Sequence, residues 1–149
     1  MSLKELTGRY IPAIDAEMRA VVQDAEEDRG NLFGMLRYHL GWMDATFERC
    51  LAHSGKRVRP VLCLMSCASC GAAWQKALPA AAAIELLHNF SLIHDDIEDE
   101  DETRRGRSTL WSIWGAAQGI NAGDTLFAVS QLAILRLQEK GIPASTVVE

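Results

Sequence analysis

The chain has 149 residues, of which 48% are hydrophobic and 23% charged, and its formal net charge is −5. This length suits a single domain with a sizeable core, and the composition is that of an ordinary globular protein. The negative charge argues against nucleic acid as the main partner, no apolar segment is long enough to cross a membrane, and the first residues lack a secretory signal pattern, so we expect a cytoplasmic protein.

Helical patterns run through the whole sequence, and the alternation typical of strands is absent. Glycine and proline mark the breaks between the helices, and Pro60 and Pro79 suit the first turns of two of them. We expect helices over residues 3–27, 31–52, 58–72, 79–99, 110–117 and 121–139. Residues 104–109 are expected to form a loop. The predicted fold class is all-α, without internal repeats.

The four cysteines allow two interpretations. Cys67 and Cys70 have the C-x-x-C spacing of redox pairs and of half zinc sites. No second C-x-x-C or H-x-H pair completes a set of four zinc ligands. We therefore favour the interpretation that the cysteines, Cys50 and Cys63 included, are small buried thiols on a packed helix.

The most unusual segment is acidic. Seven of the eight residues from Asp95 to Glu102 carry a carboxylate. At about 100° per residue, Asp95 and Asp99 share one face of the helix, and His88 lies about 20° from that face. Neighbouring carboxylates repel each other and oppose the dipole at a helix C-terminus. A divalent cation would offset this cost, and such oxygen ligands suit Mg²⁺ when substrate phosphates complete its shell.

Two simpler interpretations of the acidic run are available. One is a solvated acidic helix end, which is what most charge runs are. A calcium-binding loop is excluded, because its required glycine would fall on Glu100 or Arg104. Arginines follow the acids at 104, 105 and 107, and the segment GKRVRP at 55–60 adds three cations. Metal ions and guanidinium groups are how proteins hold a diphosphate, so these cations favour a diphosphate site.

Four segments in the same order resemble the trans-isoprenyl diphosphate synthase (polyprenyl synthetase) family. They are GKRVRP at 55–60, ELLHNFSLIHDD at 85–96, RRGR at 104–107 and NAGDTL at 121–126, and DDIED at 95–99 has the form of the family's first aspartate-rich motif. The resemblance implies a helical bundle of the isoprenoid synthase type. It also implies a Mg²⁺-dependent prenyltransferase of isoprenoid biosynthesis that condenses isopentenyl diphosphate with an allylic diphosphate, and a homodimer.

The resemblance implies roles for individual residues. Asp95 and Asp99 would coordinate Mg²⁺, with Asp96 at the edge of its coordination shell. Arg104 would bind the allylic diphosphate. The diphosphate of isopentenyl diphosphate would be bound by Lys56, Arg57, Arg59, His88 and Arg105. Without the resemblance, His88 reads as a hydrogen-bonded core histidine and the cations of 56–59 as surface charges.

Product length is a further expectation from the family. Bulk at Phe90 and Ser91, just before Asp95, would set the floor of the product pocket. The aromatic Phe90 resembles short-chain synthases, so we expect a geranylgeranyl (C20) or farnesyl (C15) product. The geometry of an ideal helix does not require this, because Phe90 points about 140° away from Asp95.

The resemblance covers nearly all of the chain but only the N-terminal half of a complete synthase. Residues 1–149 would then be the N-terminal part of one synthase domain, either as a fragment or completed by another polypeptide. Three alternatives stay open: a non-catalytic half-subunit that binds diphosphate, a class I terpene cyclase, and a helical interaction module. A cyclase leaves the GKRVRP and RRGR segments unexplained, because it has no second diphosphate to bind.

Overall fold

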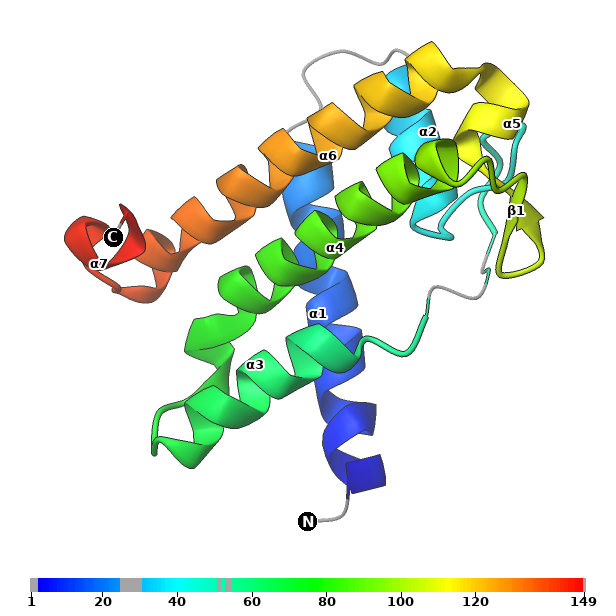
Figure 1. The fold of residues 1–149 in the computed structure, drawn as a ribbon. Helices are drawn as coiled ribbons and strands as arrows, with labels where there is room; N and C mark the ends of the chain where they lie inside the picture. Colours follow the sequence, from blue (N-terminus) through cyan, green and yellow to red (C-terminus); the bar gives the residue numbers. More distant parts are fainter. Residues whose placement is uncertain (1–2, 25–30, 51, 53–54, 149) are drawn as a thin grey trace. The chain divides into compact units, whose positions relative to one another are not determined.

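The computed structural model describes residues 3–24, 31–50, 52 and 55–148, and it confirms the all-α fold class (Figure 1). Within the described residues, two 3₁₀ helices, η1 and η2, and one small hairpin accompany the α-helices. The elements are α1 (Leu3–Asp24), α2 (Asn31–His39), α3 (Val58–Ser69), η1 (Trp74–Ala77), α4 (Leu78–Glu98), β1 (Thr103–Arg104), β2 (Arg107–Ser108), α5 (Leu110–Trp114), α6 (Ala116–Leu135), η2 (Arg136–Lys140) and α7 (Ala144–Val148). No described helix is both long enough and apolar enough to span a bilayer.

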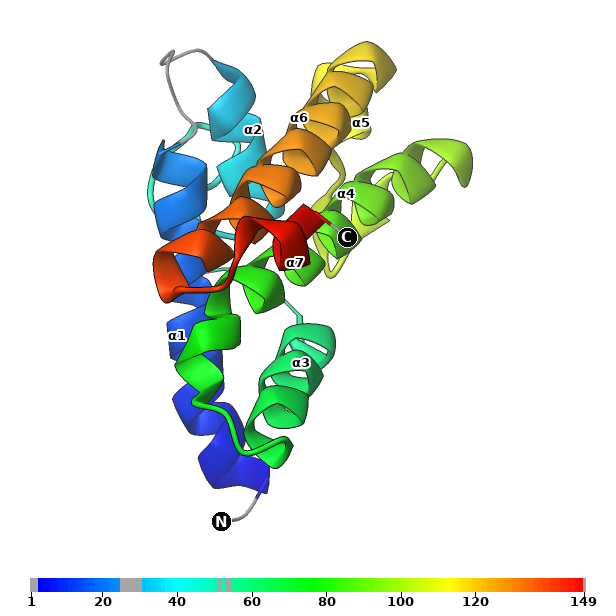
Figure 2. The ribbon, with the colours of Figure 1, turned by 90° about the vertical axis from the view of Figure 1, so that its left-hand side faces the viewer.

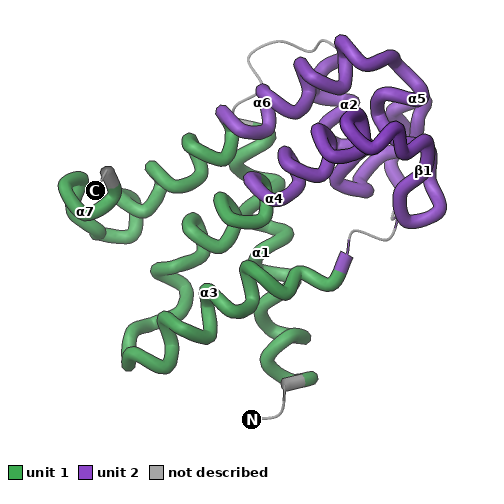
Figure 3. The backbone as a smooth tube through the Cα atoms, viewed as in Figure 1, with its two compact units in different colours: residues 1–25, 56–86, 129–149 green, residues 26–55, 87–128 purple. Residues whose placement is uncertain are grey.

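The chain divides into two compact units, which are described separately (Figure 3). Unit 1 comprises residues 1–25, 56–86 and 129–149, and unit 2 comprises residues 26–55 and 87–128. The long helices α4 and α6 each begin in one unit and end in the other. The acidic end of α4 and the hairpin after it belong to unit 2, so this unit holds most of the candidate site.

The core of unit 1 is built on one face of α1. The buried side chains of this face follow at intervals of three or four residues, as an amphipathic helix requires; they are Tyr10, Ile14, Met18, Val21 and Val22. Helix α3 lies beside α1 in both views (Figure 1 and Figure 2) and adds the buried Val61 and Leu64. Trp74 of η1 packs against α1, with its ring 4.9 Å from that of Tyr10.

The core of unit 2 is aromatic. The Trp114 ring of α5 packs edge-on against Tyr38 at 5.2 Å and stacks on Phe47 at 5.7 Å. Gly34 of α2 allows this arrangement, since a Cβ at that position would come within 2.8 Å of the Phe47 ring. Gly123 has a similar role between α6 and α4, because a Cβ there would overlap the imidazole of His94.

The helix predicted over 31–52 is wrong beyond His39. Gly41 adopts a φ of 80°, its N–H bonds to the carbonyl of Tyr38, and the N–H of Trp42 bonds to that of Arg37. These two bonds form a Schellman motif, which ends a helix at a left-handed glycine. The following residues form turns, because the Asp44 carboxylate accepts bonds from the N–H groups of Thr46 and Glu48.

The loop predicted over 104–109 is instead a two-stranded antiparallel hairpin followed by the start of α5. Arg104 pairs with Arg107, and the two residues between them, Arg105 and Gly106, have φ values of 54° and 76°. Positive φ at both positions is what a two-residue type I′ turn requires. The hairpin fixes the backbone of Arg104 and Arg105, which a flexible loop would not do.

The cysteines are free thiols, but burial was overestimated from the sequence. Cys50, Cys63 and Cys67 are half-buried, and Cys70 lies beyond the end of α3 and is exposed. Nowhere in the described ranges do three His, Cys, Asp or Glu side chains gather so that they could hold a metal ion by themselves.

Candidate functional site

Asp95 and Asp99 lie at the C-terminal end of α4, and both side chains are exposed. The backbone N–H of Asp99 bonds to the carbonyl of Asp95 at 2.8 Å, so the helical spacing predicted for this pair is present. Glu100 then adopts a φ of 55° and the chain leaves the helix. Two carboxylates one turn apart are therefore open to solvent at the point where α4 ends.

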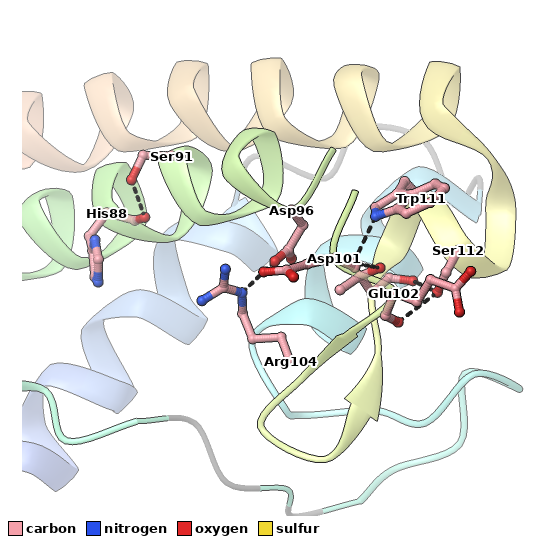
Figure 4. A network of polar contacts seen from close by, with 9 residues as sticks. His88, Ser91, Asp96, Asp101, Glu102, Arg104, Trp111 and Ser112 are labelled. Carbon is pink, nitrogen blue, oxygen red and sulfur yellow. Dashed lines mark hydrogen bonds and ion pairs between the residues drawn. The ribbon is translucent and has the colours of Figure 1, made fainter. Parts of the chain in front are cut away.

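Asp96 differs from its two acidic neighbours because it is almost fully buried, with 2% of its surface exposed. Its Oδ1 accepts a bond from Nε of Arg104 at 2.6 Å (Figure 4). Burial raises the pKa of the Asp96 carboxyl, and the Arg104 guanidinium counteracts that rise. This ion pair ties the first strand of the hairpin to the end of α4.

Side chains that follow the hairpin hold it in place. The indole N–H of Trp111 and the hydroxyl of Thr109 both donate to the carbonyl of Asp101, at 2.8 and 2.9 Å. The hydroxyl of Ser112 donates to the carbonyl of Glu102 at 3.1 Å (Figure 4). These bonds fix the acidic segment between α4 and β1. They therefore also fix the backbone position of Arg104 in β1.

Arg107 has a structural role in the same unit. Its guanidinium donates to the carbonyls of Tyr38 at 3.0 Å and Met43 at 2.7 Å, and it lies 4.0 Å from the centre of the Tyr38 ring. The Tyr38 hydroxyl in turn donates to the carbonyl of Ser108 at 2.7 Å. Arg107 therefore anchors the hairpin to α2.

A small pocket of about 30 Å³ lies beneath the hairpin. Its lining brings together two predicted diphosphate ligands, Arg104 and Arg105, with Asp96 and with His39, a residue that sequence reasoning missed. The remaining lining residues are Tyr38, Arg107, Ser108, Thr109 and Leu110. Three guanidinium groups and one carboxylate leave the pocket with a positive balance, which suits an anion.

His39 is neutral in this environment. Burial, followed by the charges of Arg105 and Arg104, lowers the pKa of its imidazole to about 3. The ring shares a hydrogen bond with the side chain of Asn89, which opposes this shift. Its Nε2 is shielded from solvent and makes no hydrogen bond.

The pKa of His39 predicts an acid sensitivity of the fold. The imidazole titrates near 6.5 when the chain is unfolded but only near 3 when it is folded, so the unfolded state binds more protons between these values. Stability is therefore expected to fall as the pH drops below about 6.5, by about 2 kcal/mol between pH 7 and pH 5. Denaturant unfolding at both pH values measures this loss. His39→Gln should reduce the loss by that amount, and an identical pH dependence in the variant would contradict the assignment.

The GKRVRP segment belongs to unit 1 from Lys56 onward. Lys56 and Arg59 are exposed, whereas the Arg57 side chain is buried, with 1% of its surface exposed. The Arg57 guanidinium pairs with Asp15 of α1 at 3.1 Å and with Glu85 of α4 at 2.8 Å. Arg57 therefore joins three helices, a role that the sequence did not suggest.

His88, Phe90 and Ser91 lie in the part of α4 that belongs to unit 2. His88 is half-buried, and its carbonyl accepts the hydroxyl of Ser91 at 2.8 Å (Figure 4). The Phe90 ring lies 4.8 Å from the ring of His94 and 5.3 Å from that of Phe127 on α6. Phe90 thus packs between α4 and α6, away from the face of Asp95.

These features find a counterpart among known proteins. A family model described as Polyprenyl synthetase matches residues 41–148. The chain belongs to the polyprenyl synthetase family. It is 40% identical over 122 residues to the geranylgeranyl diphosphate synthase of Mycobacterium tuberculosis, covering 82% of this chain and 35% of that protein. It is 41% identical over 101 residues to the (2E,6E)-farnesyl diphosphate synthase of Mycobacterium bovis, covering 68% and 28%.

Solved structures of the family show the same fold. The polyprenyl synthetase of Streptomyces coelicolor superposes with a TM-score of 0.83 at 39% identity, covering 92% of this chain and 40% of that one. The geranylgeranyl pyrophosphate synthetase of Pyrococcus horikoshii superposes with a TM-score of 0.78 at 37% identity, covering 97% and 40%. The chain thus has the isoprenoid synthase fold and spans about a third of the length of the curated relatives it matches.

Proposed function

We propose that this chain contributes the first diphosphate site of a short-chain prenyltransferase, which condenses isopentenyl diphosphate with an allylic diphosphate. The observation that carries the proposal is the exposed pair Asp95 and Asp99 at the end of α4, followed by a hairpin that presents Arg104 and Arg105. Relatives named geranylgeranyl and farnesyl diphosphate synthases support the substrate class and a C20 or C15 product.

The two carboxylates fit Mg²⁺ as a partial ligand set. Mg²⁺ keeps several waters and is held by one or two carboxylates together with substrate phosphates, so a group of three protein ligands is not needed. Asp95 and Asp99 would hold the ion, whereas the buried Asp96, already bonded to Arg104, would position that arginine. When bound, Mg²⁺ would neutralise charge that develops on the departing diphosphate.

The chain's own residues would bind and orient the two substrates. In the reaction, the bond between the allylic carbon and the diphosphate oxygen breaks, and the diphosphate keeps the electron pair. The double bond of isopentenyl diphosphate then forms the new carbon–carbon bond, and a proton is lost to the departed diphosphate. Arg104 would stabilise the allylic diphosphate as it leaves, because a fixed guanidinium acts on developing charge without reorganising.

The diphosphate of isopentenyl diphosphate is the second ligand in this proposal. Lys56 and Arg59 are exposed and suited to bind the diphosphate of isopentenyl diphosphate, together with His88 and Arg105. Arg57 was predicted to share this task. Its burial between Asp15 and Glu85 supports a structural role instead, so we leave it out of the proposed ligand set. The cytoplasmic location and the homodimer remain predictions.

A condensation assay tests the proposal. Because this chain spans about a third of the length of its curated relatives, the assay uses the full-length protein. It is incubated with Mg²⁺, isotope-labelled isopentenyl diphosphate and geranyl or farnesyl diphosphate, and labelled prenyl products are separated by length. We expect labelled C15 or C20 product that disappears when the metal is chelated. Binding of both substrates without product would favour the non-catalytic half-subunit, and cyclised hydrocarbon without label would favour a cyclase.

Phe90 should limit product length. Removing the ring by Phe90→Ala would open space between α4 and α6, where it now contacts His94 and Phe127. Products are expected to lengthen by at least one five-carbon unit. Glu98→Ala serves as the control, since it changes an exposed side chain of the same helix. An unchanged product in Phe90→Ala would reject the assignment.

A further inference from the structure

His39 is a polar group of unit 2 whose environment the proposed roles leave unexplained. Its Nε2 is buried without a hydrogen-bond partner, a state that is uncommon in native structures and points to a water or ion that belongs there. The residue lines the pocket beneath the hairpin together with Arg104 and Arg105. The residue that carries this buried nitrogen therefore lines a pocket with a positive balance of charge.

The bond to Asn89 indicates which nitrogen of His39 carries the proton. The bond raises the pKa of the imidazole, as it does when a ring N–H donates to the amide oxygen of Asn89. Because Nε2 has no partner, we assign this N–H to Nδ1. Nε2 of the neutral ring consequently carries a lone pair and is a hydrogen-bond acceptor. It can donate to an anion only after it takes up a proton.

The charged groups around His39 come from four segments. They are Asp96 on α4, Arg104 on β1, Arg105 in the turn and Arg107 on β2. Asp96 is paired with Arg104, and Arg107 is bonded to two carbonyls of the chain. An anion that approaches would offset the charges of the three guanidinium groups. These are the charges that lower the pKa of the imidazole.

The size of the pocket restricts what can enter it. A volume of about 30 Å³ holds one or two waters, so it admits a single oxygen of a phosphate group while the rest of the group stays outside. The same chemistry is offered by the end of a prenyl diphosphate, by released inorganic diphosphate and by inorganic phosphate. All three present a charged terminal oxygen.

We propose that His39 is a further residue of the diphosphate site: when a terminal phosphate oxygen enters the pocket beside Arg104 and Arg105, His39 takes up one proton from solution and donates its Nε2–H to that oxygen. The inference rests on the diphosphate-binding part of the proposed function, and it does not require the condensation reaction. Affinity for the anion then increases as the pH falls, because the bound form holds one more proton.

Calorimetric titration of the protein with inorganic diphosphate, inorganic phosphate and isopentenyl diphosphate tests the inference. Titrations at pH 6 in buffers of different ionisation enthalpy give the number of protons taken up. His39→Phe removes the nitrogen, whereas His39→Gln keeps an N–H donor that does not titrate. We expect His39→Phe to lose about 10- to 100-fold in affinity and close to one proton of uptake. His39→Gln should retain part of the affinity but none of that uptake.

Nuclear magnetic resonance of the unsubstituted protein tests the same claim without relying on the folding of a variant. The imidazole nitrogens of His39 should change from a neutral to a doubly protonated pattern when diphosphate is added. Unchanged affinity and uptake in His39→Phe, or unchanged nitrogen resonances, would overturn the role of His39 even if the condensation assay succeeds. Binding that depends on His39 without any condensation would instead contradict the proposed reaction alone. The phosphate and isopentenyl diphosphate titrations show which anion the pocket prefers.

Discussion

Replacing Asp95 or Asp99 by alanine is expected to lower the rate of prenyl transfer by about 10²- to 10⁴-fold. Each carboxylate is exposed at the end of α4, so neither change removes core packing. The loss would come from the Mg²⁺ that the pair is proposed to hold, since a metal ion supplies several kcal/mol of charge stabilisation to a departing diphosphate. Steady-state kinetics of isopentenyl diphosphate incorporation, at several Mg²⁺ concentrations, measure the effect.

Glu98 offers a matched control, because it lies between the two aspartates, carries the same charge and is exposed. Glu98→Ala should change the rate by less than about threefold, as expected for a solvated carboxylate. Equal losses in all three variants would mean that the total charge of the run matters rather than the spacing of Asp95 and Asp99. Such a result would remove the basis for a specific metal site.

Arg57→Ala is expected to lower the free energy of unfolding by about 3–5 kcal/mol. The substitution would remove the guanidinium that lies 2.8 Å from the buried carboxylate of Glu85 and 3.1 Å from that of Asp15. A buried carboxylate that loses its counter-charge is strongly destabilising, whereas exposed charges contribute little. Denaturant unfolding measures the change, with the exposed Arg59→Ala as a control that should stay within about 1 kcal/mol.

A combined variant separates the burial of Arg57 from its charge. Arg57→Met together with Glu85→Leu removes the guanidinium and its nearest buried carboxylate, and apolar replacements of a buried pair often recover the lost stability. We expect the double variant to be more stable than Arg57→Ala. If Arg57→Ala unfolds like the unsubstituted protein, the ion pairs with Asp15 and Glu85 do not hold the three helices together.

Local patterns predicted much of this structure because they depend on neighbouring residues. The placement of Asp95 and Asp99 on one face follows from the helical repeat, and the N–H of Asp99 bonds to the carbonyl of Asp95 as that repeat requires. The end of α2 at Gly41 was missed, although glycine is the usual residue after a helix C-terminus. The apolar pattern on either side of Gly41 comes from Leu40 and Trp42, which are buried without being helical.

Long-range contacts account for what the sequence could not predict. Arg57 stands in a basic segment that reads as surface, and its burial depends on Asp15 and Glu85, which are 42 and 28 residues away. The pKa of His39 is lowered because its imidazole is buried and because the hairpin brings Arg105 and Arg104 to it. Neither relation leaves a periodic signal in the sequence.

The measurement that tests the account most directly is the thermal stability of the protein with Mg²⁺, with an allylic bisphosphonate, and with both. We predict that the two ligands together raise the melting temperature by several degrees and that either alone does much less, because the metal binds through two carboxylates and the phosphonate oxygens. Asp95→Ala and Asp99→Ala should abolish the joint effect, and Glu98→Ala should retain it. Stabilisation that is absent, or that persists in both aspartate variants, would contradict a diphosphate site built on Asp95 and Asp99.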